Sequence, residues 1–539
     1  MKINLFTKAI VAVFAIVAVS CGRSDKAGPA IPKDAFIVVH VNAGSLTKKL
    51  SWDDIKKTNW FNEMYAKADD TLARKLMENP GNSGINVQED MVFFVKKQGR
   101  GAYMVFEGSV SDTSAFMAFN SQINKGADIT RGGDLNIMKL EGNGVLSWND
   151  KKFVYVINAP GMASSFSSFG ASSMEQYSFP ADSLQMFASV LYDLPSDQSM
   201  YKDDRFAATM KEEGDLHVWM NNEQTYGGLA GGMLGMLKVN ALLDQNATGM
   251  AVNFDNGKIS MNTKQFFNKD VLKLMEKFPS KEISADVINR IPSQEVAAAF
   301  VMNYPPEGLR EFLKLVGFDG AVNGYLQQVG FTMDEFIKAN KGDMLIAVTD
   351  VQMKKDSLIE EAGPDGEPTV RNAGGTDMKF LFATSINDRP AFDKMIGVIS
   401  AQMGQIGSSS MFPSFTYKLD NNWFVAGNTE PQVSQFLAGN GNKQAFASRI
   451  SGQPFGAFID LQKLMKSGTG VASDSASQQT LETSLKLWQD VIITGGKVKN
   501  NAVSYDVELN LLDKSTNSLT QLNSYFDLLS KQNKSTVSF

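Results

Sequence analysis

The chain has 539 residues, of which 43% are hydrophobic and 20% charged, and its formal net charge is −6 at pH 7. This composition supports a sizeable core, excludes disorder of the whole chain, and disfavours binding to nucleic acid through its phosphates. One cysteine and two histidines exclude an intramolecular disulfide, a cysteine-based zinc site and a histidine-rich metal cluster.

The N-terminal segment predicts a secretory signal peptide. Lys2 and Lys8 give it a positive start, and residues 9–19 form an uninterrupted apolar run of 11 residues. As a helix this run measures about 16 Å, which is too short for a bilayer core of about 30 Å. The run therefore favours a peptide that is cleaved over a segment that spans the membrane.

The only cysteine of the chain, Cys21, lies just after this run and between small residues. Its position resembles the lipobox of bacterial lipoproteins, in which the cysteine is acylated and becomes the new N-terminus. We therefore expect lipidation at Cys21, by fatty acids such as palmitate, with a signal peptide at residues 1–20 and a tether at residues 21–31. An ordinary secretory peptide with a chance cysteine is the alternative.

Three sequence patterns occur twice in the chain, in the same order. This recurrence predicts two related halves, at residues 32–280 and 290–533. Asn42 is then expected to correspond to Asn303, and a superposition is expected to pair the aspartates at positions 90 and 343. The matched segments are residues 89–95 with 342–348, 110–116 with 386–392, and 256–261 with 500–505.

Each half combines short apolar strands with amphipathic helices. Four strands end at an Asn or Asp that precedes a helix-forming stretch, and this placement predicts N-caps, because a short side-chain oxygen accepts hydrogen bonds from the first N–H groups of a helix. Turns at residues 149–152, 255–257 and 420–422 favour hairpins. The predicted fold class is α+β, with a largely antiparallel sheet in each half covered by helices on one face. The four strands are residues 35–42, 215–221, 298–303 and 456–460.

Several stretches lack an apolar period. Residues 161–173, 360–377 and 467–479 predict loops, because they are rich in Gly, Ser, Pro, Asn and acidic residues. The Gly-rich residues 227–237 are too short for a membrane span and fit a buried helix or a flexible loop.

The polar residues offer few candidates for catalysis. His40 and His217 each lie on an apolar strand, where the solvated face of a sheet explains a polar side chain, and a pair of His217 with Asp215 is the functional alternative. Four carboxylate doublets contain the acid and base that glycoside hydrolysis needs, but solvated surfaces explain them too. We expect no catalytic residue, cofactor or metal site. The doublets are Asp53–Asp54, Asp69–Asp70, Asp203–Asp204 and Glu212–Glu213.

The lipobox-like Cys21, the opening at residues 32–35, the step at residues 84–90 and the duplicated halves resemble a family of large Bacteroidetes lipoproteins, filed as a domain of unknown function. The resemblance covers most of the mature chain. It implies anchoring in the outer membrane of a Gram-negative cell, on the periplasmic face or at the cell surface. It implies no activity.

These observations predict a membrane-anchored cell-envelope lipoprotein that is a non-catalytic binding or scaffold module. Its expected partners are the lipid bilayer, through the acylated Cys21, and an unidentified envelope protein or glycan, but no nucleic acid. A carboxylate-based hydrolase of envelope or polysaccharide substrates is the alternative, and the poverty of histidine and of nucleophile motifs disfavours it. A chaperone-like holder of lipids or unfolded chains is a third interpretation. The contact between the two halves is the expected binding site.

Overall fold

The computed structural model describes residues 29–535 except 69–70, 141–143, 161, 163–176, 227–237, 239, 355–357, 363–367, 373–374, 407–414 and 470–473. Cys21, the signal peptide, most of the tether and the Gly-rich residues 227–237 lie outside the described residues. The described part forms two compact units: unit 1 holds residues 29–268 and 516–531, and unit 2 holds residues 269–515 and 532–535. None of the helices in this part is long and apolar enough to cross a bilayer.

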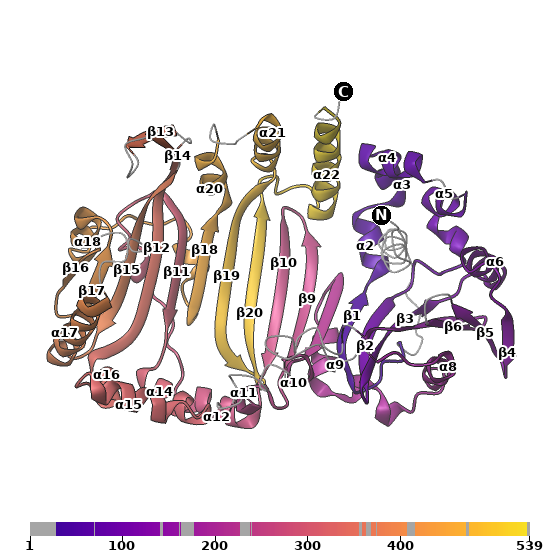
Figure 1. Ribbon diagram of the computed structural model, residues 1–539, viewed down its shortest axis with the longest axis horizontal. Coiled ribbons are helices and arrows are strands. Elements are labelled where there is room, and N and C mark those ends of the chain that lie inside the picture. Colours follow the sequence, from indigo (N-terminus) through magenta and orange to yellow (C-terminus); the bar gives the residue numbers. More distant parts are fainter. Residues whose placement is uncertain are drawn as a thin grey trace. The chain divides into compact units, whose positions relative to one another are not determined.

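Unit 1 is built on an antiparallel sheet in which β1 pairs with β2 and β8. The strand order is β6-β7-β3-β2-β1-β8-β9-β10, and β5 and β4 continue it beyond β6 (Figure 1). The strands are β1 (Ala35–Val41), β2 (Met91–Gln98), β3 (Gly101–Ser109), β4 (Ile129–Gly132), β5 (Leu135–Leu140), β6 (Gly144–Trp148), β7 (Lys152–Asn158), β8 (Leu216–Asn221), β9 (Ala247–Asp255) and β10 (Lys258–Phe266). The helices are α2 (Ala43–Lys49), α3 (Trp52–Lys56), α4 (Asn59–Lys67), α5 (Thr71–Glu78), η1 (Pro80–Ser83), α6 (Thr113–Ile123), α8 (Ala181–Val190), η2 (Ser196–Gln198), η3 (Met200–Lys202), α9 (Asp204–Met210), α10 (Asn222–Tyr226), α11 (Asn240–Leu243) and most of α22 (Ser518–Ser535).

Helices cover both faces of the unit 1 sheet. On one face of β3, Tyr103 stacks on Phe187 of α8 with ring centroids 4.6 Å apart. On the other face, Phe106 and Phe153 pack with Phe116 of α6. Figure 1 shows α6 and α8 on opposite sides of the sheet. The expectation of one covered face is therefore wrong for unit 1, because successive residues of β3 point to opposite faces and both faces are buried.

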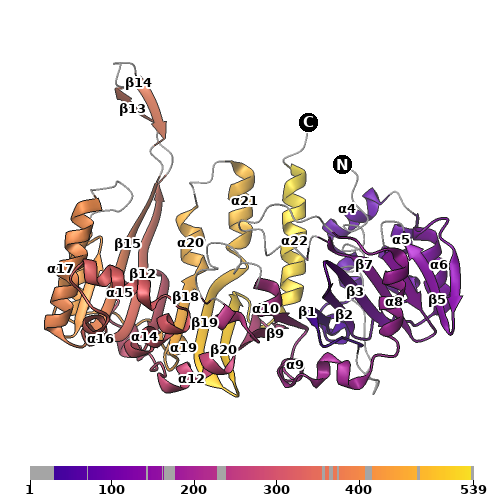
Figure 2. The same cartoon turned by 60° about the horizontal axis from the view of Figure 1, so that its bottom comes forward.

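Unit 2 repeats this arrangement with its own strands. The order is β16-β17-β15-β12-β11-β18-β19-β20, all antiparallel, and Figure 2 shows the β13–β14 hairpin beyond the ends of β12 and β15. The strands are β11 (Val296–Asn303), β12 (Asn340–Lys354), β13 (Leu358–Ala362), β14 (Pro368–Asn372), β15 (Gly375–Ile386), β16 (Thr416–Leu419), β17 (Trp423–Gly427), β18 (Phe455–Asp460), β19 (Trp488–Lys499) and β20 (Ala502–Leu511). The helices are α12 (Lys269–Lys277), α13 (Ala285–Ile288), α14 (Pro306–Leu315), α15 (Asp319–Gln328), α16 (Met333–Ala339), α17 (Arg389–Ile406), α18 (Glu430–Leu437), α19 (Ala447–Ile450), α20 (Leu461–Ser467) and α21 (Ser475–Ser484).

Eight strands of each unit share one order, position by position, and β4 and β5 are additional in unit 1. In unit 1, β1 lies between β2 and β8, and in unit 2, β11 lies between β12 and β18. The registers place Asn303 at the position of Asn42 and Asp343 at the position of Asp90, which is the predicted correspondence. The predicted fold class, α+β in two related halves with largely antiparallel sheets, is confirmed.

Three of the four predicted caps close a helix. Asn42, Asn221 and Asp460 accept hydrogen bonds from backbone N–H groups of the helices that follow, at 3.0, 3.1 and 2.8 Å. Asn303 does not, because α14 begins only after Pro305. Its buried side chain instead accepts from the N–H of Lys281 at 2.8 Å and donates to Asp343 at 2.7 Å. The prediction of a cap is therefore wrong at Asn303, which joins two segments of unit 2.

Two predicted loops contain regular structure. The paired strands β13 and β14 overlap the predicted loop at residues 360–377, and α21 begins within residues 467–479. The signal for α21 is Asp474, whose side chain accepts from the N–H of Ser477 at 2.8 Å and caps the helix. The third predicted loop, residues 161–173, lies almost wholly outside the described residues.

The first described residues, 29–33, are held to unit 1 by backbone hydrogen bonds, and we call them the rim segment. The N–H of Lys33 donates to the carbonyl of Gln198, and the N–H of Met200 donates to the carbonyl of Ile31, both at 2.8 Å. Ile31 is fully buried. These bonds fix where the chain enters the fold.

Candidate functional site

The register of two strands brings the two histidines of the chain together. β1 and β8 are antiparallel, and His40 lies directly opposite His217. Opposite residues in such a pair point to the same face, so their rings meet, with 3.2 Å between the two Nδ1 atoms. The exposed fractions are only 6% for His40 and 5% for His217. The prediction that they lie on a solvated face is therefore wrong, since the loop before β8 and the segment η3 cover this row of the sheet.

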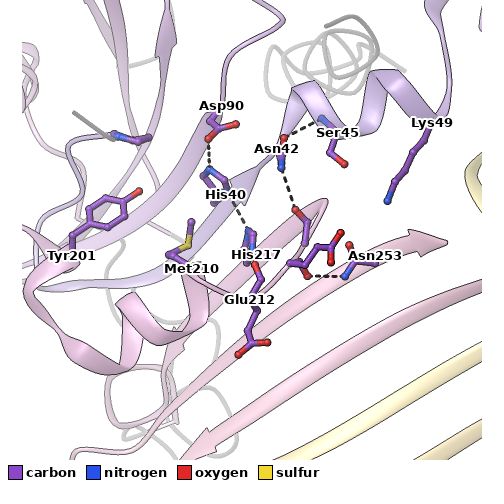
Figure 3. A pocket seen from close by; sticks show the side chains of 13 residues that line it. His40, Asn42, Ser45, Lys49, Asp90, Tyr201, Met210, Glu212, His217 and Asn253 are labelled. Carbon is purple, nitrogen blue, oxygen red and sulfur yellow. Dashed lines mark hydrogen bonds and ion pairs between the residues drawn. The ribbon is translucent and has the colours of Figure 1, made fainter. Parts of the chain in front are cut away.

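Each histidine also has a partner at its outer ring nitrogen. His40 Nε2 lies 3.1 Å from a carboxylate oxygen of Asp90, the residue just before β2. His217 Nε2 lies 3.0 Å from the backbone carbonyl of Glu212, in the loop between α9 and β8. Figure 3 shows the resulting chain of polar contacts across three segments that are distant in sequence.

A glycine lets the loop come close to the His217 ring. A Cβ atom at Gly214 would lie 2.7 Å from His217 Nε2, closer than such atoms approach one another. The absent side chain thus makes room for the ring, and the carbonyl two residues earlier receives its hydrogen bond. The sequence Glu212-Glu213-Gly214 therefore positions His217.

The environment of His217 changes its titration. Burial lowers the pKa of His217, because the charged ring loses water, and the nearby His40 lowers it further. The hydrogen bond to Glu212 and the charges of Asp90 and Asp215 act in the opposite direction. The balance keeps the neutral form of His217 favoured.

Asp215 holds the neighbouring elements together instead of pairing with His217. Its buried carboxylate accepts from the hydroxyl of Ser45 at 2.5 Å, from Lys49 Nζ at 2.6 Å and from the N–H of Phe254 at 2.7 Å. The first two donors lie on α2 and the third on β9. Asp215 therefore fixes α2 against β9, and the functional partner of a histidine is Asp90.

The histidine pair, Asp90 and the loop before β8 line a pocket of about 460 Å³ within unit 1. This volume lies in the range of small-molecule sites. The walls carry both hydrogen-bond donors and carboxylates, and burial raises the pKa of Tyr201, at one edge, to about 12. Among the lining residues are His40, His217, Asn42, Lys49, Asp90, Tyr201, Met210, Glu212, Glu213 and Asn253 (Figure 3).

The carboxylate doublets separate into different roles. Asp53 and Asp54 form ion pairs with lysines of α3 and its C-terminal neighbour, and Asp203 caps α9 and pairs with Arg205. Asp69–Asp70 lies outside the described residues. Among the three described doublets, Glu212–Glu213 is the one that reaches the pocket, and Glu212 forms an ion pair with Lys264 of β10.

No metal centre is found in the part of the chain that the structure describes, where no three His, Cys, Asp or Glu side chains gather as ligands. In the histidine pair the two Nδ1 atoms face each other, so a hydrogen bond occupies the space between the rings.

The duplicated unit lacks this site. The register of β11 with β18 places Val301 at the position of His40 and Gly456 at the position of His217. Pro454 replaces Asp215, since its carbonyl accepts the N–H of Asn303 as that of Asp215 accepts the N–H of Asn42. A Cβ atom at Gly456 would lie 2.7 Å from that of Ile450 in α19, so α19 fills the corresponding space. The pocket is a property of unit 1.

Comparison with known proteins adds a family. The profile of DUF4836, a domain of unknown function, matches residues 29–360, which is more than half of the chain. The chain belongs to the DUF4836 family. The match begins at the rim segment and includes every pocket residue, and the expectation of a family without known function is confirmed. A Bacteroidetes origin and a lipid anchor stay predictions.

Solved structures and curated proteins add little to the DUF4836 assignment. Crystal forms III and I of TP0453 are each 10% identical to this chain, with a TM-score of 0.25. They cover 48% of this chain, and 90% and 88% of their own chains. Similarity at this level carries no conclusion about function. No curated protein matches the chain.

Proposed function

We propose that this protein is a cell-envelope lipoprotein that binds a glycan fragment in the unit 1 pocket without changing it chemically. The proposal rests on the residues that line the pocket. Lysine, asparagine and tyrosine donors alternate there with carboxylate acceptors, and Met210 and the Tyr201 ring add apolar surface. Sugars present hydroxyls in many directions together with apolar C–H faces, so a mixed lining of this kind suits them.

Binding is favoured over hydrolysis because two of the three carboxylates that line the pocket already have partners. Asp90 pairs with His40, and Glu212 pairs with Lys264. A glycosidase needs one carboxylic acid that gives its proton to the leaving group and a second carboxylate that attacks or activates water. Asp90 and Glu212 are thus already engaged within the fold, which leaves Glu213 where the reaction needs two carboxylates.

Binding is tested on the mature chain, made soluble by Cys21→Ala. Isothermal titration with muropeptides, lipopolysaccharide-core oligosaccharides and plant and host polysaccharide fragments is expected to give a complex. The double variant His40→Val/His217→Gly carries the residues found at the same positions of unit 2, and it is the matched control. The variant is expected to fold and to lose binding. Equal binding by the variant would place the ligand elsewhere, and release of shortened sugars would make the protein a hydrolase.

The proposed anchor is Cys21. Support comes from its place at the end of the apolar run and from the rim segment, which begins eight residues later at Pro29. Cys21→Ala is expected to move the protein from the membrane fraction to the soluble fraction, because no acyl chain is then attached. Retention of the variant in membranes after a high-salt wash would show that a different feature holds the protein there.

A further inference from the structure

The contacts of the histidine pair fix how many protons it carries. The carbonyl of Glu212 only accepts, so His217 Nε2 must donate to it. The carboxylate of Asp90 accepts as well, so His40 Nε2 must donate. One further hydrogen joins the two Nδ1 atoms. The three contacts thus need three N–H groups on two rings, which is one more than two neutral imidazoles carry.

The contacts assign the third N–H group to His40. Its Nε2 faces a carboxylate, whereas that of His217 faces an uncharged carbonyl. The lowered pKa of His217 agrees with this assignment. His40 therefore donates through both nitrogens, and His217 is the neutral tautomer that accepts at Nδ1.

We propose that His40 and His217 hold a single shared charge near neutral pH, and that a second proton, taken up in acid, separates the rings and releases the ligand of the pocket. Release of a ligand rests on the proposed function, but the proton count does not. With four protons the two Nδ1–H groups would point at each other across 3.2 Å, and two positive rings would be in contact. The rings form part of the pocket lining, so their separation changes the shape of the site.

Other charged groups surround the pair on every side. Histidine is the side chain whose ordinary pKa, about 6.5, lies between neutral and mildly acidic pH. Glu107 of β3 lies in the same row of the sheet as His40. Its titration must be distinguished from that of the histidines, because burial raises the pKa of Glu107 although Lys152 Nζ lies 2.9 Å away. The groups facing the pair are Asp90 before β2, Glu212 and Glu213 before β8, Asp215 with Lys49 of α2, Tyr201 of η3, Lys264 of β10 through Glu212, and Glu107 of β3.

Nitrogen NMR of the histidine rings reads the proton count directly. The chain has two histidines, so labelling histidine with ¹⁵N in the Cys21→Ala mature chain gives two ring systems. The single variants His40→Val and His217→Gly assign them. At about pH 7.5 we expect His40 with both nitrogens protonated and His217 neutral with its proton on Nε2. At about pH 5 we expect the second ring to become charged.

The ligand arm uses the same muropeptide and lipopolysaccharide-core probes. Between about pH 7.5 and pH 5, we expect the Kd to rise at least about tenfold, which corresponds to one pKa unit of difference between the free and the bound pair. Glu107→Gln removes the other candidate for titration, and we expect the same pH dependence in this variant.

The outcomes distinguish the two proposals. Two neutral rings at pH 7.5, or two rings that titrate independently near the ordinary value, would overturn the shared charge even if a glycan binds. The expected ring pattern without binding of any probe would leave the shared charge standing and refute the glycan function. A pH dependence that Glu107→Gln abolishes would assign the switch to Glu107 and refute the role of the histidines.

Discussion

Gly214 shows how one missing side chain sets the geometry of the pocket. A methyl group there would collide with His217 Nε2, and the backbone of the loop leaves it little room to move aside, because Leu216 O would lie 3.1 Å away. The ring must then leave the carbonyl of Glu212. The hydrogen bond at the buried end of the pair therefore depends on a glycine.

Gly214→Ala is accordingly expected to destabilise the protein by about 1–3 kcal/mol, the usual cost of a buried polar group without its partner. Denaturant unfolding measures the loss, and the ring nitrogen shifts of His217 report the broken bond. Gly320→Ala, on α15, is the control, because a Cβ atom there has nothing within 4 Å and alanine favours helix. Equal effects of the two substitutions would contradict the close contact.

The lowered pKa of His217 also gives stability a pH dependence. In the unfolded chain His217 has its ordinary pKa, about 6.5, so the unfolded state binds a proton at a higher pH than the folded state. The contribution of His217 to the free energy of unfolding is therefore expected to fall as pH drops through about 6.5, until the lower folded pKa is passed.

Denaturant unfolding at about pH 7.5 and pH 5 measures this effect. His217→Gly removes the group, so the variant is expected to lose less stability on acidification than the parent chain. If both chains lose the same amount, His217 does not titrate on unfolding in the way that its burial demands.

At the scale of elements, the sequence predicted the features that depend on residues close together in the chain, namely turns and helix caps. Turns such as residues 255–257, and caps such as Asn42 and Asp460, are local, and the structure contains them. Even α21 has a local signal, in Asp474. The order of the repeated segments also predicted the correspondence of the two units, because equivalent strands retain similar sequences.

The pocket could not be predicted in the same way. His40 and His217 are 177 residues apart, and their contact depends on the register of β1 with β8, which no local pattern specifies. The sequence indicated two histidines on apolar strands, but the predicted solvated face was wrong for both, since they are 6% and 5% exposed. Glycine before β8 was the one available signal, since a loop with Glu212-Glu213-Gly214 permits a close approach to a strand residue.

Asn303 is the cap prediction that the structure changes most. Its amide links the N–H of Lys281 to the carboxylate of Asp343, and it is 4% exposed. Asn303→Ala is expected to cost about 2 kcal/mol, because two buried polar groups lose their partner. Asp112→Ala, which removes the cap of α6 at the N–H of Ala115, is expected to cost about 1 kcal/mol. Denaturant unfolding compares them, and a smaller cost at Asn303 would contradict its linking role.

At the scale of the whole molecule, one scaffold occurs twice with different contents. Unit 1 has a histidine pair and a pocket, whereas unit 2 has Val301 and Gly456 at those positions and places α19 in the space. Substitutions between the units are therefore not symmetrical. A small residue can replace His217 in unit 1, but a large residue cannot replace Gly456 in unit 2, because α19 lies against it.

Gly456→His is expected to prevent folding of unit 2 or to cost more than about 3 kcal/mol, since overpacking against Ile450 forces backbone and side chains apart. The equivalent change in the other direction, His217→Gly, is expected to leave a folded chain. Circular dichroism and thermal unfolding compare the two. A well-folded Gly456→His protein would show that α19 does not occupy the space.

The rim segment has a consequence for where the pocket operates. Pro29 lines the pocket and lies eight residues after Cys21. An extended chain spans at most about 3.5 Å per residue, so eight residues reach about 28 Å. If Cys21 is held at a bilayer surface, the rim of the pocket stays within that height above the lipid headgroups. Only molecules in this thin layer next to the membrane could then bind in the pocket. The length of the tether would therefore limit which ligands the protein can reach.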